Sequence, residues 1–557
     1  MLYHTIPERT YARRKYTEKK KIFSKSDVLF MLALAGVILV HLSRIRMGMV
    51  EPDESFYLAI PFRYIQGDVP LIDEWNMGQM FGILIYPILK IYFWFVKDTE
   101  GIYLAFRYIW LVSSTTTAII SYFLLRRKNQ YIGAAASVMI SLFTYACIRA
   151  LSYNTMITMA VWLFVVLSVT EIRHYKIKFF LMGLLMAAVI LCNPFMFLYY
   201  IAYAIVCLIR REKRQGYYGL ESLGYVTLGG AVVAILLLWF IFSRTTIFEF
   251  FQNLSGVLYN PSHKMKTVTS FFEPIINFVD WFKLYFGCYA VGTGFLIFGK
   301  KWKKVAFVSL LVLSSFLWIL LIVFKTEGVG RFAIYLPMTM LGLSVFLATK
   351  KKNWVFFGRG WIMGIALACC MNLASNQGIY AILDACCISA AVSLFLVKDY
   401  LDENEMWFGK KIWIILLACL QIFSQIWINL NSVFWANDIS ELKYKIEEGP
   451  AKGVYTSEDK KRNYMINYEN LKALGDLDGK KIMIFNYFSA GYMVVPEARC
   501  GAFSPWMTEY NTPDHEQFLR YYRLHPDRVP DIVYFDVESE CDWTQEDWEN
   551  WCKKNGL

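Results

Sequence analysis

The chain has 557 residues, of which 57% are hydrophobic and 18% are charged. Soluble globular proteins carry roughly a quarter charged residues, so this composition excludes an ordinary soluble domain and indicates a membrane protein. The net charge of +12 comes from short basic clusters between apolar runs. That distribution is typical of membrane orientation signals and argues against nucleic-acid binding.

The first element is a basic segment followed by an apolar run. Residues 1–27 are polar and basic over too long a stretch for a signal peptide, and no small-residue cleavage site follows the apolar residues "VLFMLALAGVILVHL" at 28–42. We therefore expect a cytoplasmic tail over 1–27 and a permanent first span over 28–46.

The next stretch, 47–100, concentrates acidic residues just beyond that span. The acids in its first part, "VEPDESFYLAIPFRYIQGDVPLIDEW", include Glu51, Asp53, Glu54 and Asp73. Pro52 favours a helix start, which would place the first-turn acids at the positive end of a helix and put Asp53 and Tyr57 on one face. Acids in this position are also common as solvated helix caps, so the pattern alone does not define a site.

Twelve further apolar runs follow, and a basic cluster falls in every second gap between them. The runs lie at 101–125, 131–148, 155–170, 179–192, 195–209, 222–242, 284–299, 305–324, 332–348, 354–371, 379–397 and 412–430. The basic clusters are "RRK" (126–128), "RHYKIK" (173–178), "RREKR" (210–214), "KKWKK" (300–304), "KKK" (350–352) and the flank 398–411. The positive-inside rule places these clusters in the cytoplasm.

The run "FGILIYPILKIYFWFV" at 81–96 would break this alternation if it crossed the membrane. It is short, contains Pro87 and Lys90, and by crossing would turn every later basic cluster outward. We therefore expect it to lie along the interface or re-enter. The resulting prediction is an all-α polytopic domain over 28–430 with about thirteen transmembrane helices and a cytoplasmic N-terminus.

Residues 431–557 are polar and predict a small extracytoplasmic α/β domain. The segments "KKIMIFNY" (480–487) and "PDIVYFDV" (530–537) are typical of strands, and 516–525 is typical of a helix. The sequence has no P-loop, GxGxxG or GxSxG motif, which disfavours an ATP-driven pump.

The outer stretch resembles the first outer loop of the C-type glycosyltransferases (GT-C). These polytopic enzymes take a sugar from a polyprenyl-phosphate carrier and transfer it to an acceptor outside the cytoplasm; lipid A aminoarabinose transferases and protein O-mannosyltransferases are well-known members. The resemblance covers about residues 28–348. It rests on the order of six motifs: Asp53–Glu54, then Gly67, Pro70 and Asp73, then the aromatic and Pro-containing segment "GILIYPILKIYFWF" at 82–95, then Phe106–Arg107, then Arg126–Arg127, and finally "GRFAIYLPM" at 330–338.

The resemblance implies a catalytic role for two acids. Asp53 would act as the general base that takes a proton from the acceptor hydroxyl, with inversion at the anomeric carbon, and Glu54 would hold Asp53 or an arginine in position. Contacts with donor or acceptor are implied for Tyr57, Arg63, Asp73, Arg107, Arg149, Tyr153, Asn154, Glu327 and Arg331, and Trp75 could also contact sugar. The arginines would bind the leaving phosphate, although interfacial arginines and aromatics are also common as membrane anchors.

One position departs from the pattern. Many C-type glycosyltransferases have a second acid in the next outer loop, sometimes as a metal ligand, whereas "IRALSYNTM" has Asn154 there. An amide oxygen can bind a hydroxyl or a metal but supplies no charge. The sequence thus predicts no certain cofactor and leaves a divalent cation possible.

The favoured interpretation is a multi-pass cell-membrane glycosyltransferase. Its partners would be a polyprenyl-phosphate-sugar donor, membrane lipids, and an acceptor lipid, cell-envelope glycan or protein. Three alternatives stay open: a lipid-linked-sugar transporter or flippase, a non-catalytic membrane subunit, and a lipid-linked glycan polymerase. A transporter would place its ionisable residues within the spans, whereas here the acids concentrate outside them.

Overall fold

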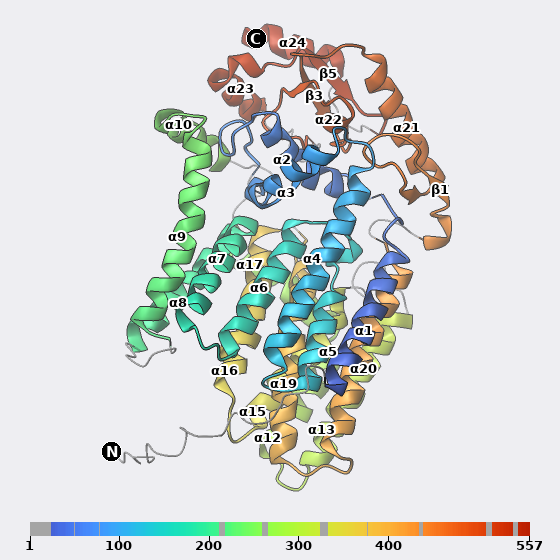
Figure 1. The fold of residues 1–557 in the computed structure, drawn as a ribbon. Coiled ribbons are helices and arrows are strands. Elements are labelled where there is room, and N and C mark those ends of the chain that lie inside the picture. The colour runs from blue at the N-terminus through green and yellow to red at the C-terminus, as the bar shows by residue number, and fades with distance from the viewer. Residues whose placement is uncertain are drawn as a thin grey trace.

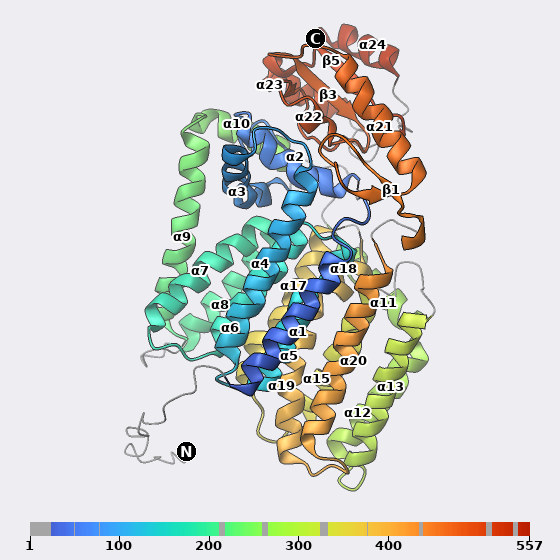
Figure 2. The ribbon, with the colours of Figure 1, turned by 45° about the vertical axis from the view of Figure 1, so that its right-hand side comes forward.

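The structure is a computed structural model, and most of its residues are helical. It describes residues 24–49, 51–76, 78–210, 218–258, 266–323, 332–375, 377–433, 438–507, 515–538 and 544–557. The helices form an elongated bundle, and a small mixed domain built from the C-terminal residues covers one end of it (Figures 1 and 2). Most of the cytoplasmic tail predicted at 1–27 lies outside the described residues.

The bundle is built from helices along most of the chain. In order, they are α1 (Lys25–Leu42), α4 (Ile102–Leu125), α5 (Gln130–Ser141), α6 (Tyr153–Val169), α7 (Tyr175–Cys192), α8 (Phe197–Arg210), α9 (Leu220–Phe242), α12 (Lys283–Phe298), α13 (Lys303–Val323), α15 (Leu336–Ala348), α16 (Trp354–Phe356), α17 (Ile362–Ala374), α18 (Ile379–Ala385), α19 (Cys387–Glu403) and α20 (Lys410–Asn431). Large apolar side chains such as Leu39, Ile235 and Trp239 are exposed on these helices. Lipid tails would cover such a surface in a membrane.

Helix length and composition identify a multi-pass membrane protein. Six helices within the described ranges are long and apolar enough to cross a membrane, or up to eight if each bent pair counts as one span. Further apolar helices, such as α6 and α15, are shorter than these. The coarse prediction of a polytopic helical protein is confirmed, while thirteen spans stays a prediction.

The predicted span at 131–148 is interrupted. Helix α5 ends at Ser141, and the chain then makes a 3-10 turn at Tyr145–Cys147 in which Ala146 has a φ of 49°. The backbone N–H of Ala146 donates to the Asp384 carboxylate (3.1 Å). The prediction was wrong here because the sequence stays apolar through the turn, so hydropathy alone does not reveal the break.

Several helices lie at one end of the bundle, where outer loops were predicted. They are α2 (Asp53–Ile65), the 3-10 turn η1 (Gln79–Phe81), α3 (Gly82–Phe95), α10 (Ile247–Leu258) and α11 (Val268–Trp281). Helices α2, α3 and α10 flank the C-terminal domain in two views (Figures 1 and 2). Helix α3 extends about 21 Å at 1.5 Å per residue, less than the ~30 Å hydrocarbon layer, which agrees with the expectation that 81–96 does not cross.

The C-terminal residues form a three-stranded parallel sheet with helices around it. Its strand order is β4 (Arg499–Cys500), β3 (Lys481–Phe485), β5 (Ile532–Phe535), with Ile482 opposite both Cys500 and Ile532. The other elements are β1 (Tyr444–Lys445) paired antiparallel with β2 (Tyr455–Thr456), α21 (Glu458–Ala473), α22 (Gly491–Val494), α23 (His515–Leu524) and α24 (Gln545–Asn555). Both predicted strands and the predicted helix are present.

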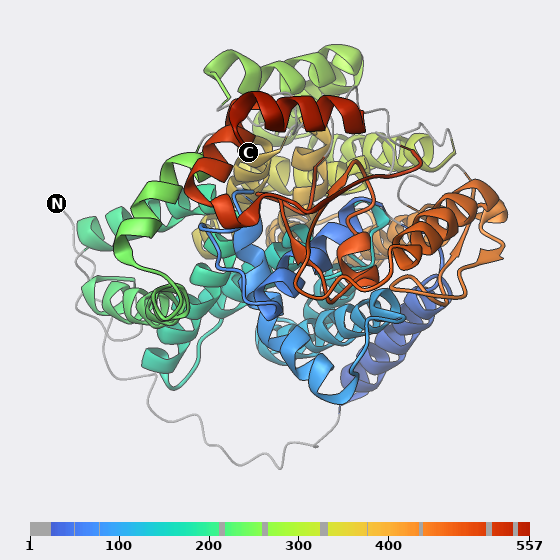
Figure 3. The same ribbon diagram turned by 90° about the horizontal axis from the view of Figure 1, so that it is seen from above.

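This domain packs directly on the first outer stretch. Seen from above, its elements lie over α2 and the surrounding loops (Figure 3). Backbone hydrogen bonds join Gly48 N–H to Tyr455 O (2.8 Å) and Trp75 N–H to Phe503 O (2.7 Å). The buried Trp75 ring meets Tyr521 edge-on with ring centroids 5.0 Å apart. The C-terminal domain therefore covers the acidic outer stretch at 47–100.

Candidate functional site

The site is organised by the first turn of α2. Asp53 and Glu54 are its first two residues, directly after Pro52. Negative side chains are favourable at this end of a helix because the unsatisfied N–H groups give it a partial positive charge. The two carboxylates are adjacent in sequence, but they meet different surroundings.

Glu54 is locked in a bidentate ion pair. Arg107 on α4 donates from Nε to Oε1 (2.6 Å) and from Nη2 to Oε2 (2.5 Å). The same guanidinium donates to the carbonyls of Ile45 (2.8 Å) and Gly48 (2.6 Å). Both side chains are buried, so this pair fixes the start of α2 against α4 and against the end of the first span. Glu54 and Arg107 thus have the geometry of positioning residues.

Asp53 has no such partner. Its carboxylate makes no hydrogen bond or ion pair within the described ranges, and its side chain keeps part of its surface accessible. Burial by the surrounding protein nevertheless raises its pKa to about 6. A carboxylate with this pKa is ionised at neutral pH and is a stronger proton acceptor than an ordinary aspartate.

Tyrosine rings lie beside Asp53. The charge of Asp53 adds to burial in raising the pKa of Tyr57 and of Tyr153. The Tyr57 and Tyr153 rings meet edge-on at 5.7 Å, and both contact the Phe81 ring, at 5.8 and 5.7 Å. The structure therefore brings the first outer stretch and the start of α6 together around one carboxylate.

The start of α6 adds a polar atom without a partner. Ser152 and Thr155 form a capping box that fixes the first turn of this helix. Asn154 in that turn is buried, and its Oδ1 has no hydrogen-bond partner. A buried amide oxygen left unpaired costs about 1–3 kcal/mol. A ligand hydroxyl or cation would supply the missing partner.

Arg149, three residues before the capping box, is a buried cation that no carboxylate neutralises in the described part of the chain. Its Nη2 donates to the backbone carbonyl of Asn429 (2.7 Å), and its Nε has no partner. Burial and the positive charges of Arg107 and Arg44 lower its pKa. An anion beside this guanidinium would relieve both the burial and the repulsion.

Arg63 and Asp73 belong to a separate buried network. Arg63 donates to Asp68 (2.7 Å) and to Glu74 (2.5 Å). Arg528 of the C-terminal domain donates to Asp68 (2.8 Å) and to Asp73 (2.9 Å). These alternating charges join the outer stretch to the domain above it. Their mutual pairing favours a structural role for Arg63 and Asp73 over the predicted substrate contact.

The predicted residues therefore divide into groups. Those gathered near Asp53 are Glu54, Tyr57, Arg107, Tyr153 and Asn154; Arg149 lies near Arg107; and Arg63, Asp73 and Trp75 lie at the interface with the C-terminal domain. Glu327 and Arg331 fall outside the described residues. The described ranges contain no cluster of three His, Cys, Asp or Glu side chains that could hold a metal ion. The possible divalent cation stays a prediction from sequence.

Two residues of the site had no individual role in the sequence prediction, although Glu51 was among the acids it singled out. Glu51 accepts a hydrogen bond from Tyr103 (2.6 Å) and another from Ser55, and burial raises its pKa to about 8, so it is mostly protonated at neutral pH. Asn429, whose backbone carbonyl accepts a hydrogen bond from Arg149, lies on α20, the last bundle helix along the chain. Its polarity within the apolar run 412–430 is the only sequence signal that could have drawn attention to it.

Comparisons with known proteins identify structural neighbours only. No family model matches the chain, and no curated protein matches it. Similar solved structures include the oligosaccharyltransferase of Archaeoglobus fulgidus tethered with an acceptor peptide, with a TM-score of 0.44, 12% identity, and coverage of 87% of this chain and 64% of that one. The apo form of that enzyme has a TM-score of 0.44 and 11% identity, with coverage of 87% of this chain and 64% of that one.

A third neighbour is the archaeal oligosaccharyltransferase AglB from the same organism, in complex with an inhibitory peptide and a dolichol-phosphate. Its TM-score is 0.42 at 10% identity, with coverage of 92% of this chain and 69% of that one. The chain spans about 64% of the length of the first two neighbours. These neighbours are C-type glycosyltransferases, the class that the outer-loop motifs resemble. Since all the TM-scores are below 0.5, the function proposed below rests on the residues of the site.

Proposed function

We propose that this chain is a membrane glycosyltransferase that moves a sugar from a polyprenyl-phosphate carrier to a hydroxyl acceptor at the outer membrane surface. The observation that carries the proposal is the contrast around Asp53. Its neighbour Glu54 is fully paired, whereas Asp53 is unpaired, partly accessible and has a pKa raised to about 6. A carboxylate held in that state suits a general base.

In the proposed reaction, the Asp53 carboxylate accepts the proton of the acceptor hydroxyl. The acceptor oxygen forms a bond to the anomeric carbon as the bond from that carbon to the phosphate oxygen breaks, so the configuration inverts. The electron pair leaves with the polyprenyl phosphate. Arg149 is the proposed cation for this phosphate because its buried guanidinium is not matched by a carboxylate in the described ranges.

Two further residues would orient the substrates. Asn154 Oδ1 is free to accept a hydrogen bond from a sugar or acceptor hydroxyl. The ring of Tyr153, held against Tyr57 and Phe81, offers an apolar wall beside it. Arg331 and Glu327 keep their predicted contacts with donor or acceptor as part of this proposal. The proposal also includes about thirteen spans, a cytoplasmic N-terminus, and the extracytoplasmic domain 431–557.

The test is sugar transfer by the purified full-length chain in lipid vesicles supplied with polyprenyl-phosphate-linked sugars and a panel of hydroxyl acceptors. Asp53→Asn is expected to lower the rate by about 10²- to 10⁴-fold, the usual contribution of a general base. Asp98→Asn is the matched control, because Asp98 is an exposed acid of the same outer stretch. Full activity in Asp53→Asn would remove the base assignment, and carrier movement across the bilayer without bond cleavage would favour the transporter.

A further inference from the structure

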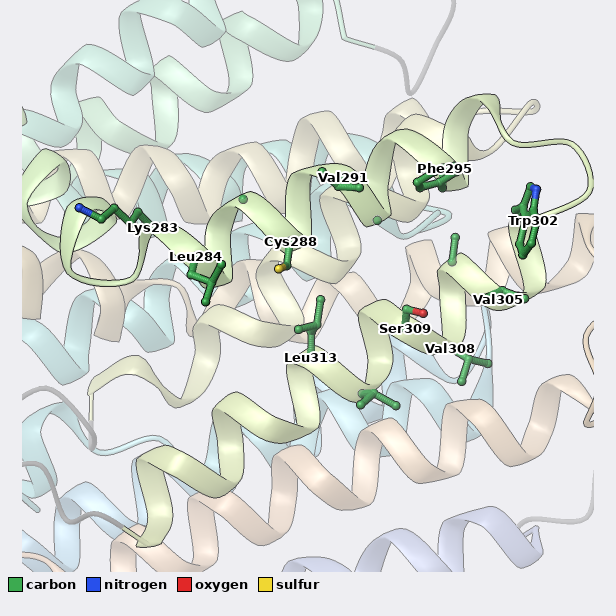
Figure 4. A pocket seen from close by; sticks show the side chains of 14 residues that line it. Lys283, Leu284, Cys288, Val291, Phe295, Trp302, Val305, Val308, Ser309 and Leu313 are labelled. Carbon is green, nitrogen blue, oxygen red and sulfur yellow. The ribbon is translucent and has the colours of Figure 1, made fainter.

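The end of the bundle opposite the C-terminal domain carries two adjoining hollows between its helices. The first is an apolar groove of about 1230 Å³ between α12 and α13. In Figure 4, side chains of both helices, among them Cys288, Val291 and Leu313, line the space between them. The groove ends near Trp302, in the turn that joins the two helices. That turn lies at the far end from the C-terminal domain in Figures 1 and 2.

The second hollow is cationic and begins at the same turn. It has a volume of about 270 Å³ and is lined by Lys300, Lys301, Lys303, Lys304, Glu403, Asn404, Glu405 and Met406. None of the four lysines lies within 4 Å of a carboxylate oxygen in the described part of the chain. The Glu403 carboxylate instead accepts the backbone N–H groups of Lys350 (2.8 Å) and Lys351 (2.7 Å). A third basic loop therefore adjoins the same hollow.

Together, these surfaces fit an amphiphile with an anionic head. The groove extends along α13 from Val305 to Leu313, about 12 Å, and along α12 from Phe295 back to Lys283, about 18 Å, at 1.5 Å per residue. At that far end Lys283 is paired with Asp280 (3.3 Å). These lengths are close to half of the ~30 Å hydrocarbon layer, the depth of one leaflet. Trp302 is 60% exposed between the lysines, as expected of an aromatic residue at the headgroup level. An apolar tail slot one leaflet deep, ending at unpaired lysines, has complementary parts for both ends of a phospholipid.

We propose that this turn binds an anionic phospholipid of the adjacent leaflet, with its phosphate at Lys300–Lys304 and an acyl chain in the groove between α12 and α13. The positive-inside rule makes that leaflet the cytoplasmic one. The site lies at the opposite end of the bundle from Asp53, so it stands or falls independently of the proposed transfer reaction. Its function would be to anchor the α12–α13 hairpin, whose outer surface exposes large apolar side chains such as Val291 and Val312.

Two sets of variants separate the headgroup from the tail. Replacing Lys300, Lys301, Lys303 and Lys304 together by Gln removes the cationic part, and the matched control replaces the exposed Lys443, Lys445, Lys472 and Lys480 of the C-terminal domain by Gln. Gly287→Leu fills the groove, since a Cβ there meets no atom within 4 Å. Gly294→Leu is its control, because Gly294 is equally open on the same helix but does not line the groove.

The full chain is first delipidated in detergent and then titrated with phosphatidylglycerol or phosphatidylcholine. Native mass spectrometry measures how much of each lipid the protein retains. Wild type is expected to retain phosphatidylglycerol at least tenfold more tightly, because each lysine near a headgroup contributes roughly fivefold. The quadruple Lys variant should lose that preference, and Gly287→Leu should weaken retention of both lipids. Thermal unfolding confirms that each variant is folded.

Four results would overturn the proposal. One is an unchanged lipid preference in the quadruple Lys variant, and another is an equal loss in its C-terminal control. The third is displacement of phosphatidylglycerol by inorganic phosphate at equal concentration, since that would show an ion site without a tail slot. Preferential displacement by a polyprenyl phosphate would instead assign the groove to the donor carrier and would equally reject a phospholipid.

Discussion

The charged side chains at the two ends of α2 differ in whether they are paired. At its C-terminal end, Arg63 meets Asp68 and Glu74, and Arg528 completes the pairing, so the buried charges there alternate in sign. At its N-terminal end, Asp53 has no polar partner within the described ranges, and Asn154 nearby keeps an unpaired oxygen. Both ends are enclosed by protein, so burial alone does not explain the contrast.

The contrast separates structure from chemistry. Buried charges that are paired with good geometry hold two parts of a protein in register, and removing one partner is costly. Buried polar atoms without partners destabilise the folded state, so they are expected where a ligand supplies the missing partner. By this criterion, the Arg63 network fastens the C-terminal domain, whereas Asp53 and Asn154 keep polar atoms that the proposed substrates could bind.

The largest expected effect is on stability at the paired end. Arg63→Met leaves Asp68 and Glu74 without the guanidinium that joins them, and it should lower the free energy of unfolding by about 3–5 kcal/mol. Thermal unfolding in detergent measures the change. Arg499→Met is the control, because Arg499 is exposed on β4 and makes no ion pair within the described residues. Equal stability of the two variants would contradict a fastening role.

Arg149 sharpens the comparison from the other side. Arg149→Gln removes a buried cation that lacks a carboxylate partner in the described ranges, so stability should change far less than in Arg63→Met. The transfer rate should fall by about 10²- to 10³-fold, as for the loss of one donor to a developing anion. Initial rates at saturating acceptor give the number. A rate within threefold of wild type would exclude Arg149 as the phosphate ligand.

Much of the fold could be predicted because segments that cross a bilayer must be long and apolar, which is visible in the local composition. The run 28–42, the basic gaps and the strand 480–487 each need only local sequence to be recognised. The break after Ser141 could not, since its backbone is held by Asp384 from a distant helix. Long-range contacts of this kind leave no trace in hydropathy.

The same limit applied to the site. The pairing of acids with arginines could not be predicted from the sequence, because nothing in the sequence says which acid an arginine contacts. In the structure, Arg107 binds Glu54, whereas Arg528 binds Asp68 and Asp73. Position after a span suggested that Asp53 matters, but only the fold distinguishes it from Glu54 beside it. Which of the two acids is neutralised by an arginine depends on tertiary contacts.

The pH dependence of transfer gives a smaller, graded effect. Because burial raises the pKa of Asp53 to about 6, the rate should fall about tenfold for each pH unit below that value as the base becomes protonated. A folded-state pKa above the unfolded value means that protonation of Asp53 favours the folded state, so this group adds stability as pH falls through about 6. Activity loss should therefore precede unfolding. Asp98→Asn should keep the wild-type profile, and a rate that stays flat to about pH 5 would contradict the assignment.

The smallest expected effect comes from comparing two buried asparagines at helix starts. Asn154→Ala removes an unpaired oxygen, which stabilises the folded state, but it also removes the side-chain hydrogen bond to Tyr153. Because these effects oppose each other, stability should change by less than about 1 kcal/mol, whereas KM for donor or acceptor should rise about tenfold. Asn193→Ala is the counterpart, because Asn193 donates to Cys370 O (3.1 Å) and accepts from Phe195 N–H (3.1 Å). It should lose about 1–2 kcal/mol of stability and leave KM unchanged. The reverse outcome would mean that the unpaired oxygen at Asn154 marks no ligand.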